Sequence, residues 1–442
     1  METQRAPSGG EGVLRAGFAT VDITPPVGIH LGGYASRTSP SLAVGQPLYA
    51  KAMALSCGGT TVSVVATDLL FITALLARGI RALVRQRVAI PEDHVLLSAT
   101  HTHSGPLLEH MSMVEEEVVD EGWIENVLIG KIADSVCLAN GCMRPARIGT
   151  GSTEIHGLTF NRRPRRQDGR VEAAHNLFTR DGPVSFEALE FGPVDPDLGV
   201  FSVYDFEDRL LGSMVNFSCH PVCNDYGPRT ISSDYPGLAT QVIEEATRAT
   251  CLFTTAPSAE VNPAVRNGSH MKAVLSRQAL SVLETIEPFG CEGLWAGSRR
   301  INLPLKAFPT VEEARRRFEK ELAEESPDRF LCRRDLMYAE QYEGRTDLET
   351  EIQVVGVGDI LLIGLPGEVS VEIGLLMKEE VASRFGKRFV FAITQANDWT
   401  GETIPDRAYG EGGSEPRTTR LGPGSADAML EGVLELLDAA LG

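Results

Sequence analysis

Two histidines follow directly after a short apolar run in the stretch Val95–Pro106, which reads VLLSATHTHSGP. The apolar run predicts a buried strand, and the small residues and the Gly-Pro pair after it predict where the strand ends. His101 and His103 are separated by one residue, so in an extended chain both imidazoles face the same side. Neutral imidazole is a common transition-metal ligand and a common general acid or base. The alternative is a loop with two solvated or hydrogen-bonded histidines.

Other functional groups also follow apolar runs in this chain. Together with the two histidines they form the set Asp68, His101, His103, His220, Glu260, Asn262, Glu368, Asn397, Asp398 and Glu402. Ligands of open α/β sheets collect beyond the carboxyl ends of the strands, so these side chains are predicted to share one site. Two or three histidines with one or two carboxylates are typical of catalytic zinc, which lowers the pKa of bound water to roughly 7 and polarises a carbonyl. This chemistry suits amide or ester hydrolysis.

Two other arrangements stay open at this stage. The segment Cys219-His220-Pro221-Val222-Cys223 offers a rival set of metal ligands, and either of its cysteines with a histidine such as His103 could form a nucleophile–base pair. The HExxH and GxSxG motifs are absent, which argues against the common zinc-protease helix and an ordinary serine hydrolase.

The loop 157–171 is strongly basic in an acidic protein. It carries Arg162, Arg163, Arg165, Arg166 and Arg170. A solvated turn is the simpler interpretation for most of these arginines. The functional interpretation is that at least one reaches into a site that holds an anion or a polarised carbonyl.

The elements that must position these groups are predicted from hydrophobic periodicity. Strands are expected within 61–72, 95–99, 185–216, 251–263 and 388–402, and helices over 73–88, 115–140, 270–287 and 310–325. This order predicts an α/β fold of mixed β-sheets flanked by helices, with the active site at the C-terminal ends of strands. Residues 1–13 are expected to be disordered. Residues 14–442 are expected to form one catalytic domain, with a possible exposed helical insertion over 310–349.

Composition narrows the class of protein. The 442 residues carry a formal net charge of −19, which argues against nucleic acid or an anionic membrane as the main partner. No run of 18 apolar residues and no signal-like N-terminal segment occurs, so we expect no transmembrane segment and a cytoplasmic location. Eight cysteines without a CxxC pair predict reduced thiols. The oligomeric state is not predicted.

The segments ATVDITPP, SATHTHSGP, FNRR, the His220 strand end, PGE and QAND follow one another as in the neutral/alkaline non-lysosomal ceramidase family. The chain resembles this family over about residues 16–413, and SATHTHSGP is the most specific motif. The likeness is nearest to short single-domain bacterial relatives, and the immunoglobulin-like C-terminal domain is not expected. The family consists of zinc amidases that cleave the N-acyl bond of ceramide. The resemblance therefore implies one Zn²⁺ per chain, with His101, His220 and Glu368 as ligands and with His103 and Arg162 contacting and polarising the substrate amide.

Two positions depart from the family pattern. Where the ceramidases place a zinc-bound tyrosine in GY(I/V)TT, this chain reads GETIP, so Glu402 is expected as a ligand, with Tyr409 or Asp398 as alternatives. Where the family has the substrate-contacting serine of GDVSPN, this chain has Asn262. Because an amide side chain both donates and accepts hydrogen bonds, a small soluble amide is at least as well suited as a sphingolipid.

The expected function is zinc-dependent hydrolysis of a small-molecule or lipid amide. Glu402 or His103 would help to deprotonate the metal-bound water, and the metal with Arg162 or His103 would stabilise the oxyanion. One alternative is a metal-dependent hydrolase of an ester, lactone, glycoside or phosphoester, with a basic pocket at Arg162–Arg166 favouring phosphate. The other is a catalytically silent scaffold or binding protein of the same fold, which predicts no stoichiometric metal.

Overall fold

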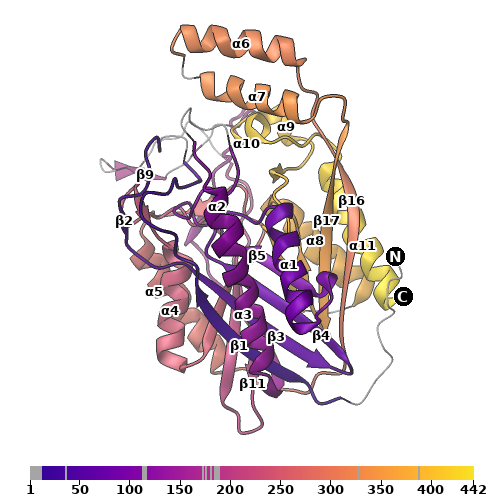
Figure 1. The fold of residues 1–442 in the computed structure, drawn as a ribbon. Coiled ribbons are helices and arrows are strands. Elements are labelled where there is room, and N and C mark those ends of the chain that lie inside the picture. The colour runs from indigo at the N-terminus through magenta and orange to yellow at the C-terminus, as the bar shows by residue number, and fades with distance from the viewer. Residues whose placement is uncertain are drawn as a thin grey trace.

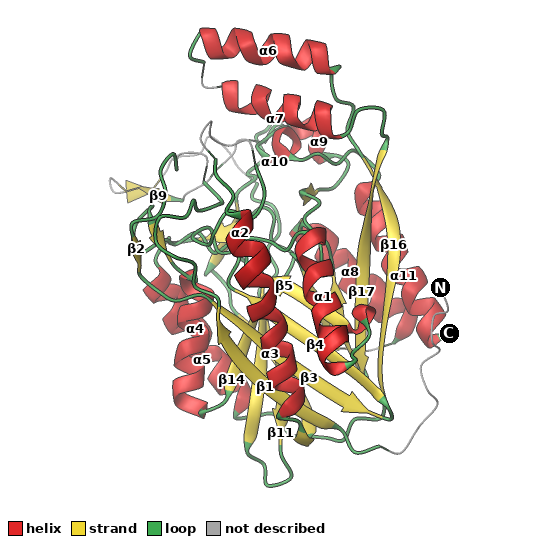
Figure 2. Ribbon diagram, in the orientation of Figure 1, coloured by secondary structure: helices red, strands yellow, loops and turns green. Residues whose placement is uncertain are grey.

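The computed structural model describes residues 12–34, 37–111, 117–171, 174, 177–179, 182–183, 190–326, 328–386 and 389–442. Most of the stretch predicted to be disordered, residues 1–13, lies outside these ranges, as do residues 185–189 at the start of the stretch 185–216, in which strands are expected. The described chain folds into mixed β-sheets with helices on their outer faces (Figure 1, Figure 2).

The first sheet has the strand order β5-β4-β3-β1-β6. Its strands are β1 (Arg15–Asp22), β3 (Tyr49–Cys57), β4 (Thr60–Thr67), β5 (Val95–Ala99) and β6 (Arg144–Pro145). Alternate residues point to opposite faces: Val65 and Leu97 join one core, whereas Val64 and Leu96 join another. Helices α1 (Ala74–Val88) and α3 (Ile129–Gly141) cover the first of these faces. Both faces are therefore apolar, as the unbroken runs of valine and leucine predict.

Two further sheets pack against the other face. One has the order β14-β12-β11-β7 and the other β16-β17-β18-β20. They comprise β7 (Arg147–Glu154), β11 (Asp197–Tyr204), β12 (Leu210–Phe217) and β14 (Thr250–Thr255), then β16 (Leu294–Pro304), β17 (Asp347–Val357), β18 (Ile360–Gly364) and β20 (Phe389–Ile393). The two sheets meet where Thr394 N donates to Thr255 O at 2.9 Å. Met53, Phe201 and Leu362 share the core between these sheets and the first one.

Helices close the outer faces of the second and third sheets. They are α4 (Asp234–Thr247) and α5 (Gly268–Leu283) on the second sheet, and α8 (Val371–Phe385) and α11 (Ser425–Leu441) on the third. The result is a layered arrangement of helices, two sheet layers and helices. The prediction of an α/β fold with mixed sheets flanked by helices is confirmed.

Each main sheet contains one parallel pair of strands: β4 with β5, β12 with β14, and β18 with β20. The segments after these strands carry the predicted site residues. His101 and His103 follow β5, His220 follows β12, Glu368 follows β18, and Glu402 follows β20. The site therefore lies at the carboxyl ends of strands, as predicted.

The long hairpin of β16 and β17 carries a helical pair in its connection, α6 (Val311–Ala323) and α7 (Arg329–Gln341). A capping box formed by Thr310 and Glu313 begins α6 near the predicted start. Figure 1 shows the pair above the short helices α9 (Ala408–Glu411) and α10 (Glu415–Thr418). Only Ala314 of α6 is buried, whereas α7 buries Arg334, Tyr338 and Ala339. Helix α7 is thus packed onto the molecule and α6 lies outside it.

Short elements complete the described fold. They are β2 (Ala43–Val44), β8 (Thr159–Asn161), β9 (Phe178–Thr179), β10 (Gly182–Pro183), β13 (Thr230–Ile231), β15 (Val261–Pro263), β19 (Glu368–Val369), β21 (Glu402–Thr403), α2 (Glu121–Trp123), the 3₁₀ turn Glu92–His94 and the π-helical turn Ile124–Leu128. No helix within the described ranges is long and apolar enough to cross a membrane.

Candidate metal centre and active site

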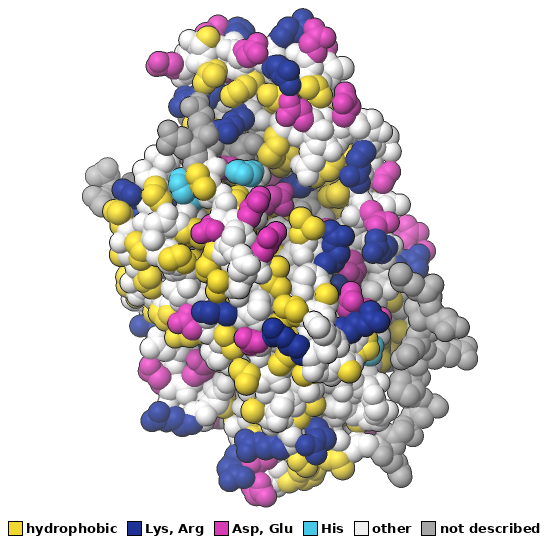
Figure 3. Space-filling view, viewed as in Figure 1, with side chains coloured by type: hydrophobic (Ala, Val, Ile, Leu, Met, Phe, Trp, Pro, Cys, Tyr) yellow, Lys and Arg dark blue, Asp and Glu magenta, His cyan; other side chains and the backbone are white. Residues whose placement is uncertain are grey.

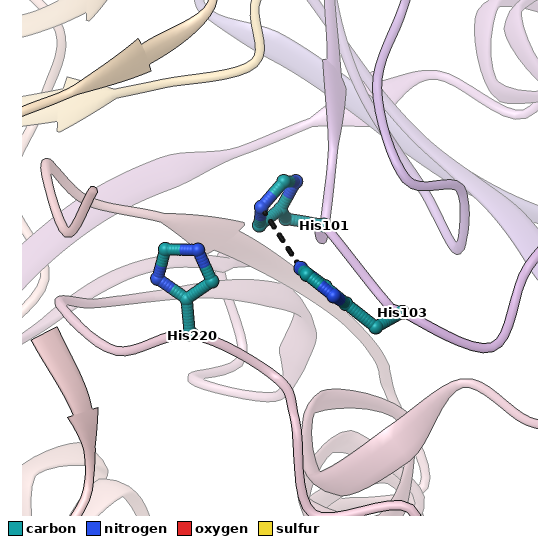
Figure 4. Close-up of side chains that lie close together, drawn as sticks. All are labelled: His101, His103 and His220. Atoms are coloured by element: carbon teal, nitrogen blue, oxygen red, sulfur yellow. Dashed lines mark hydrogen bonds between the residues drawn. The ribbon is translucent and has the colours of Figure 1, made fainter. Parts of the chain in front are cut away.

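Three imidazoles meet at the ends of β5 and β12. The candidate ligand atoms of His101, His103 and His220 all lie within 4.8 Å of one another (Figure 4). His101 and His220 are each 2% exposed. His101 adopts a left-handed backbone with φ of 69°, which is rare outside glycine and turns its ring toward the other two.

Hydrogen bonds to the backbone fix the orientation of each ring. The Nδ1 atoms of His101, His103 and His220 bond to the carbonyls of Leu70, Gly33 and Ser258 at 2.6, 2.9 and 2.8 Å. A carbonyl oxygen can only accept, so each Nδ1 carries the proton. In the neutral rings each Nε2 is then a lone pair directed at the others, which is the arrangement of metal-ligating histidines.

The pKa values of His103 and His220 also favour neutral rings that can bind a metal. Burial, followed by the charges of His101 and His220, lowers the pKa of His103 well below its usual value. Burial and the charge of Arg162 lower the pKa of His220 to about 4. His101 Nε2 and His103 Nε2 lie 3.2 Å apart. Where both Nε2 atoms present a lone pair, that contact joins two acceptors, which a shared proton or a cation between them would stabilise.

Glu368 adds an oxygen ligand to this group. Its Oε2 lies 3.4 Å from His101 Nε2 and 3.2 Å from His220 Nε2. Burial alone would raise the pKa of Glu368, but the charge of His101 when it is protonated, with hydrogen bonds from His101 and His220, outweighs burial and holds the pKa well below the usual range. A bound cation would act on this carboxylate in the same direction as those protons. The tight turn at Gly367, with φ of 68°, delivers the carboxylate. Two of the imidazole nitrogens, those of His101 and His220, with the carboxylate of Glu368 fit the donor set of catalytic zinc, and the third imidazole, His103, lies beside them.

Glu402 lies beside Glu368, because β19 and β21 pair in parallel with these two residues in register. Glu402 Oε2 accepts a hydrogen bond from Thr418 Oγ1 at 2.5 Å, and Oε1 lies 3.8 Å from Arg162 Nη2. Burial and the neighbouring charge of Glu368 raise the pKa of Glu402 to about 8. This carboxyl therefore holds a proton near neutral pH unless a cation approaches it.

The two alternatives to Glu402 are engaged elsewhere. Tyr409 donates its hydroxyl to Leu421 O at 2.9 Å. Asp398 accepts from the amides of Ala74 and Trp399 at 3.2 and 2.8 Å, and so holds the start of α1. Neither side chain lines the cavity that contains the histidines, whereas Glu402 does.

Both interpretations of the basic loop apply, each to different arginines. Arg163 and Arg165 bind Glu415 and Glu411 at 2.6 and 2.9 Å, so they are structural ion pairs. Arg162 Nε donates to Glu415 Oε1 at 2.9 Å while its side chain lines the cavity. Glu415, which is 1% exposed, was not found by sequence reasoning, because nothing in its local sequence distinguishes it from a surface glutamate.

The structure does not bring Asn262 to the cavity wall. Asn262 lies on β15, opposite Phe160 of β8, and is fully buried. It is not among the residues that line the cavity. β15 pairs with β8, the strand that leads into Arg162, so Asn262 lies in the layer next to that residue. Its contact with a substrate stays a prediction.

Several other strand-end groups satisfy the backbone. Asn397 Oδ1 accepts from Leu97 N at 3.0 Å, and Asp68 Oδ2 accepts from Tyr49 N at 2.9 Å. Glu260 accepts from Ser370 Oγ and Val371 N at the start of α8. Polar groups that follow buried strands thus either join the site or replace lost backbone partners, and the sequence alone does not separate the two roles.

The cysteine alternatives are disfavoured. Cys219 is fully buried, and its Sγ donates to His220 O at 3.6 Å. Burial raises the pKa of both Cys219 and Cys223, so neither thiol ionises readily into a nucleophile or metal ligand.

The histidines open into a cavity of about 450 Å³, a size suited to a small molecule. Helix α7 contributes Arg334, Met337 and Tyr338 to its wall. The remaining lining residues are Gly33, Tyr34, Leu70, His101, His103, His110, Met111, Arg162, His220, Val222, Arg266, Glu368, Trp399, Gly401, Glu402, Ser414, Thr418 and Arg420. The contribution of α7 was missed because the weakly apolar stretch 326–349 indicates exposure. One face of α7 nevertheless reaches the site.

Fold and site together define an α/β protein with a candidate metal centre at strand ends. The sequence model of the family described as neutral/alkaline non-lysosomal ceramidase, N-terminal, matches residues 14–261, more than half of the chain. The chain belongs to this family, which confirms the resemblance.

Neutral ceramidase from Pseudomonas aeruginosa is 27% identical over 236 residues, which cover 51% of this chain and 32% of that protein. The match spans about a third of the length of this curated relative. The crystal structure of neutral ceramidase from P. aeruginosa superposes with a TM-score of 0.74 at 19% identity, covering 98% of this chain and 76% of that chain. A structure described as ceramidase complexed with C2 gives a TM-score of 0.71 at 18% identity, covering 95% and 74%. These similarities show that the fold is shared.

Proposed function

We propose that this protein is a zinc-dependent hydrolase of an N-acyl amide bond, with one Zn²⁺ held by His101, His220, Glu368 and Glu402. The observation that carries the proposal is the convergence of neutral imidazole nitrogens on the buried carboxylate of Glu368. Membership of the ceramidase family supports amide hydrolysis as the reaction. The catalytic unit would comprise residues 14–442.

A zinc ion in such a site supplies a water of lowered pKa and polarises the carbonyl of the substrate. His103, neutral and hydrogen-bonded through Nδ1, accepts a proton at Nε2 and can return it to the leaving amine. Arg162, fixed by Glu415 and charged at all relevant pH values, stabilises the oxyanion that develops on the carbonyl. Water adds across the C–N bond, giving a carboxylate and an amine.

An amide is favoured over a phosphoester because the basic loop is largely neutralised. Glu415 binds both Arg162 and Arg163, and Glu411 binds Arg165. The loop therefore offers less positive charge than its sequence suggests. All eight cysteines are free, which supports the cytoplasmic location that we include in the proposal.

The test is metal content by elemental analysis on protein purified without a histidine tag. We expect one zinc per wild-type chain, its loss in His101→Ala and His220→Ala, and its retention in His156→Ala, whose ring is exposed and pairs with Glu154. His103→Ala should keep zinc but lose amide hydrolysis by at least about 100-fold, as removal of a general base does. Loss of zinc in His103→Ala would instead make this residue a ligand. A wild type that takes up no zinc would overturn the proposal and favour the silent scaffold.

A further inference from the structure

We propose that the cavity binds a carboxylate of its substrate through Arg334 and Arg420, so that the amide cleaved is an N-acylated amino acid rather than a neutral lipid amide. This inference rests on the proposed amide hydrolysis and names its substrate class. It would assign a binding role to α7, the inner member of the helical pair.

Arg334 is a buried cation without a direct anionic partner among the residues that the structure describes. It lies on α7, is 9% exposed and lines the cavity. No hydrogen bond or ion pair joins its guanidinium to any residue that the structure describes. Its described electrostatic neighbours are Lys306 and Asp335, at longer range. Burying a charge is costly unless an opposite charge or several hydrogen bonds compensate it, so a ligand anion would stabilise this position.

Arg420 is held in place from one side only. Its Nη1 donates to the Tyr342 hydroxyl at 2.8 Å, and its guanidinium lies 5.1 and 6.0 Å from the rings of Tyr338 and Tyr342. Its Nε is buried without a hydrogen-bond partner among the described residues. Glu109 and Asp398 interact with Arg420 electrostatically, but neither forms an ion pair with it in the described structure. The guanidinium is thus rigid, charged and incompletely paired, as in preorganised carboxylate sites.

The charge of the cavity wall differs from that of the protein as a whole. The chain carries a net charge of −19, yet Arg162, Arg266, Arg334 and Arg420 line this one cavity. The acidic residues of the wall are Glu368 and Glu402, which belong to the candidate metal site. On the face seen in Figure 3, basic and acidic side chains are intermixed over the helical pair. Within the cavity, Arg162 is paired with Glu415, so Arg334 and Arg420 are the arginines on which the inference rests.

Apolar side chains complete the wall and limit what the substrate can be. Leu70, Met111, Val222, Met337 and Trp399 line the cavity, and Trp399 stacks on Phe71 with ring centroids 4.6 Å apart. A substrate therefore presents an amide to the histidines and Arg162, a carboxylate to Arg334 and Arg420, and a compact apolar group to the remaining wall. Arg420 stacks on Tyr338, which lies one helical turn from Arg334 on α7. An acylated apolar amino acid combines these three features within about 450 Å³.

The experiment compares two substrates that differ only in the carboxylate: N-acetylphenylalanine and N-acetylphenethylamine. The readout is the ratio of kcat/KM values for the charged and the neutral compound, measured with zinc-loaded protein. We expect the wild type to favour the charged substrate at least tenfold. Arg334→Met and Arg420→Met should each lower that ratio by about tenfold or more, since each removes one charge-assisted contact. Arg334→Lys, which keeps the charge, should retain part of the preference.

Arg316→Met is the matched control, because Arg316 is exposed on α6 and contributes nothing to the cavity wall. It removes the same charge from the helical pair and should leave the ratio unchanged. Thermal melting identifies any variant that fails to fold. If Arg334→Met does not fold, the substrate ratio measured for Arg334→Lys tests the inference in its place.

Binding separates failure of this inference from failure of the proposed function. Titration calorimetry with N-acetylphenylalanine should show binding to the wild type and at least tenfold weaker binding to Arg334→Met, even if neither compound is hydrolysed. That outcome would support the carboxylate site while the hydrolase proposal failed. Hydrolysis of both compounds at equal rates, or equal binding by wild type and variant, would overturn the inference and leave zinc hydrolysis standing. No binding of the carboxylate would also overturn it.

Discussion

The three histidines of the candidate metal centre depend on residues that never touch a metal. The Nδ1 proton of each ring is held by a carbonyl from a different part of the chain: Leu70 after β4, Gly33 before β2, and Ser258 after β14. Such outer contacts decide which nitrogen is free to bind. The backbone of Gly33 lies so close to the His103 ring that an added Cβ would lie 2.6 Å from that ring.

At the same scale, Glu415→Gln should destabilise the protein and impair catalysis. The substitution leaves the buried guanidinium groups of Arg162 and Arg163 without their common carboxylate. Breaking a buried pair from one side costs about 3–5 kcal/mol, which denaturant unfolding monitored by circular dichroism would measure. The control is Glu190→Gln, since Glu190 is exposed and lies 3.9 Å from Arg165. Its effect should stay below about 0.5 kcal/mol, and equal effects of the two substitutions would contradict this account.

At the residue scale, sequence reasoning found residues that line the cavity more readily than the residues that support them. His101, His103, His220, Glu368, Glu402 and Arg162 all line one cavity, because polar groups after buried apolar runs are costly unless they serve a site or a backbone partner. Asn262, which the resemblance to the family pointed to, is buried and does not line the wall of the cavity. Glu415 and Arg334 could not be found, since only tertiary packing turns a glutamate or arginine of an ordinary helix into a buried charge.

Among the elements, the turn between β18 and α8 has a strict backbone requirement. It presents Glu368, whose partner strand carries Glu402. A Cβ on Gly367 would overlap Gly401 O and Thr400 Oγ1, and the backbone there has φ of 68°. The turn therefore combines a left-handed conformation with a close approach of two chain segments.

Gly367→Ala should accordingly lower both stability and zinc content. Gly344→Ala is a matched control, because Gly344 has φ of 72° but no atom lies within 4 Å of the position that an added methyl group would take. The control isolates the cost of the left-handed backbone, about 1 kcal/mol. We expect Gly367→Ala to cost at least about 2 kcal/mol more in unfolding experiments and to reduce bound zinc in elemental analysis. Similar losses in the two variants would show that the close approach is unimportant.

Element positions were predicted well where periodicity was strong. The helix expected over 73–88 is α1, Ala74–Val88, and the one expected over 270–287 is α5, Gly268–Leu283. The pairing of strands into three main sheets, and the parallel pairs that align the site, follow from contacts across the whole chain and have no local signal. Composition likewise could not show that α7 covers the cavity, because its buried face includes an arginine and a tyrosine.

On the scale of the whole molecule, buried carboxyls link global stability to pH. Burial raises the pKa of Asp68 from 3.8 to about 6, even though Lys51 and the amide of Tyr49 oppose the shift. The folded protein therefore binds this proton more tightly than the unfolded chain does. The stabilisation that comes from protonated Asp68 is fully present below the pKa of Asp68 in the unfolded chain, and it is lost as pH rises through about 6.

Asp68→Asn removes this titration. The free energy of unfolding of the variant minus that of the wild type should grow by up to about 3 kcal/mol between about pH 4 and pH 6.5, as a shift of about two pKa units implies. Urea unfolding at a series of pH values would measure it. Placing an amide next to Tyr49 N has a cost that does not change with pH. The test is therefore how the difference in unfolding free energy between variant and wild type changes with pH, and not its absolute size. A difference that is flat with pH would contradict the raised pKa.

The helical pair α6–α7 leaves and rejoins the molecule at a single point. Pro304 and Asp347 are paired in register at the end of the β16–β17 hairpin, and Leu305 N donates to Thr346 O at 2.9 Å. Because the ends of this excursion are already joined, its length and composition can change with little effect on the sheets below, since loop closure depends only weakly on length. The pair is therefore a natural unit for grafting. Exchanging it between relatives would replace one wall of the cavity, while the histidines of the candidate metal centre stay where they are, after β5 and β12.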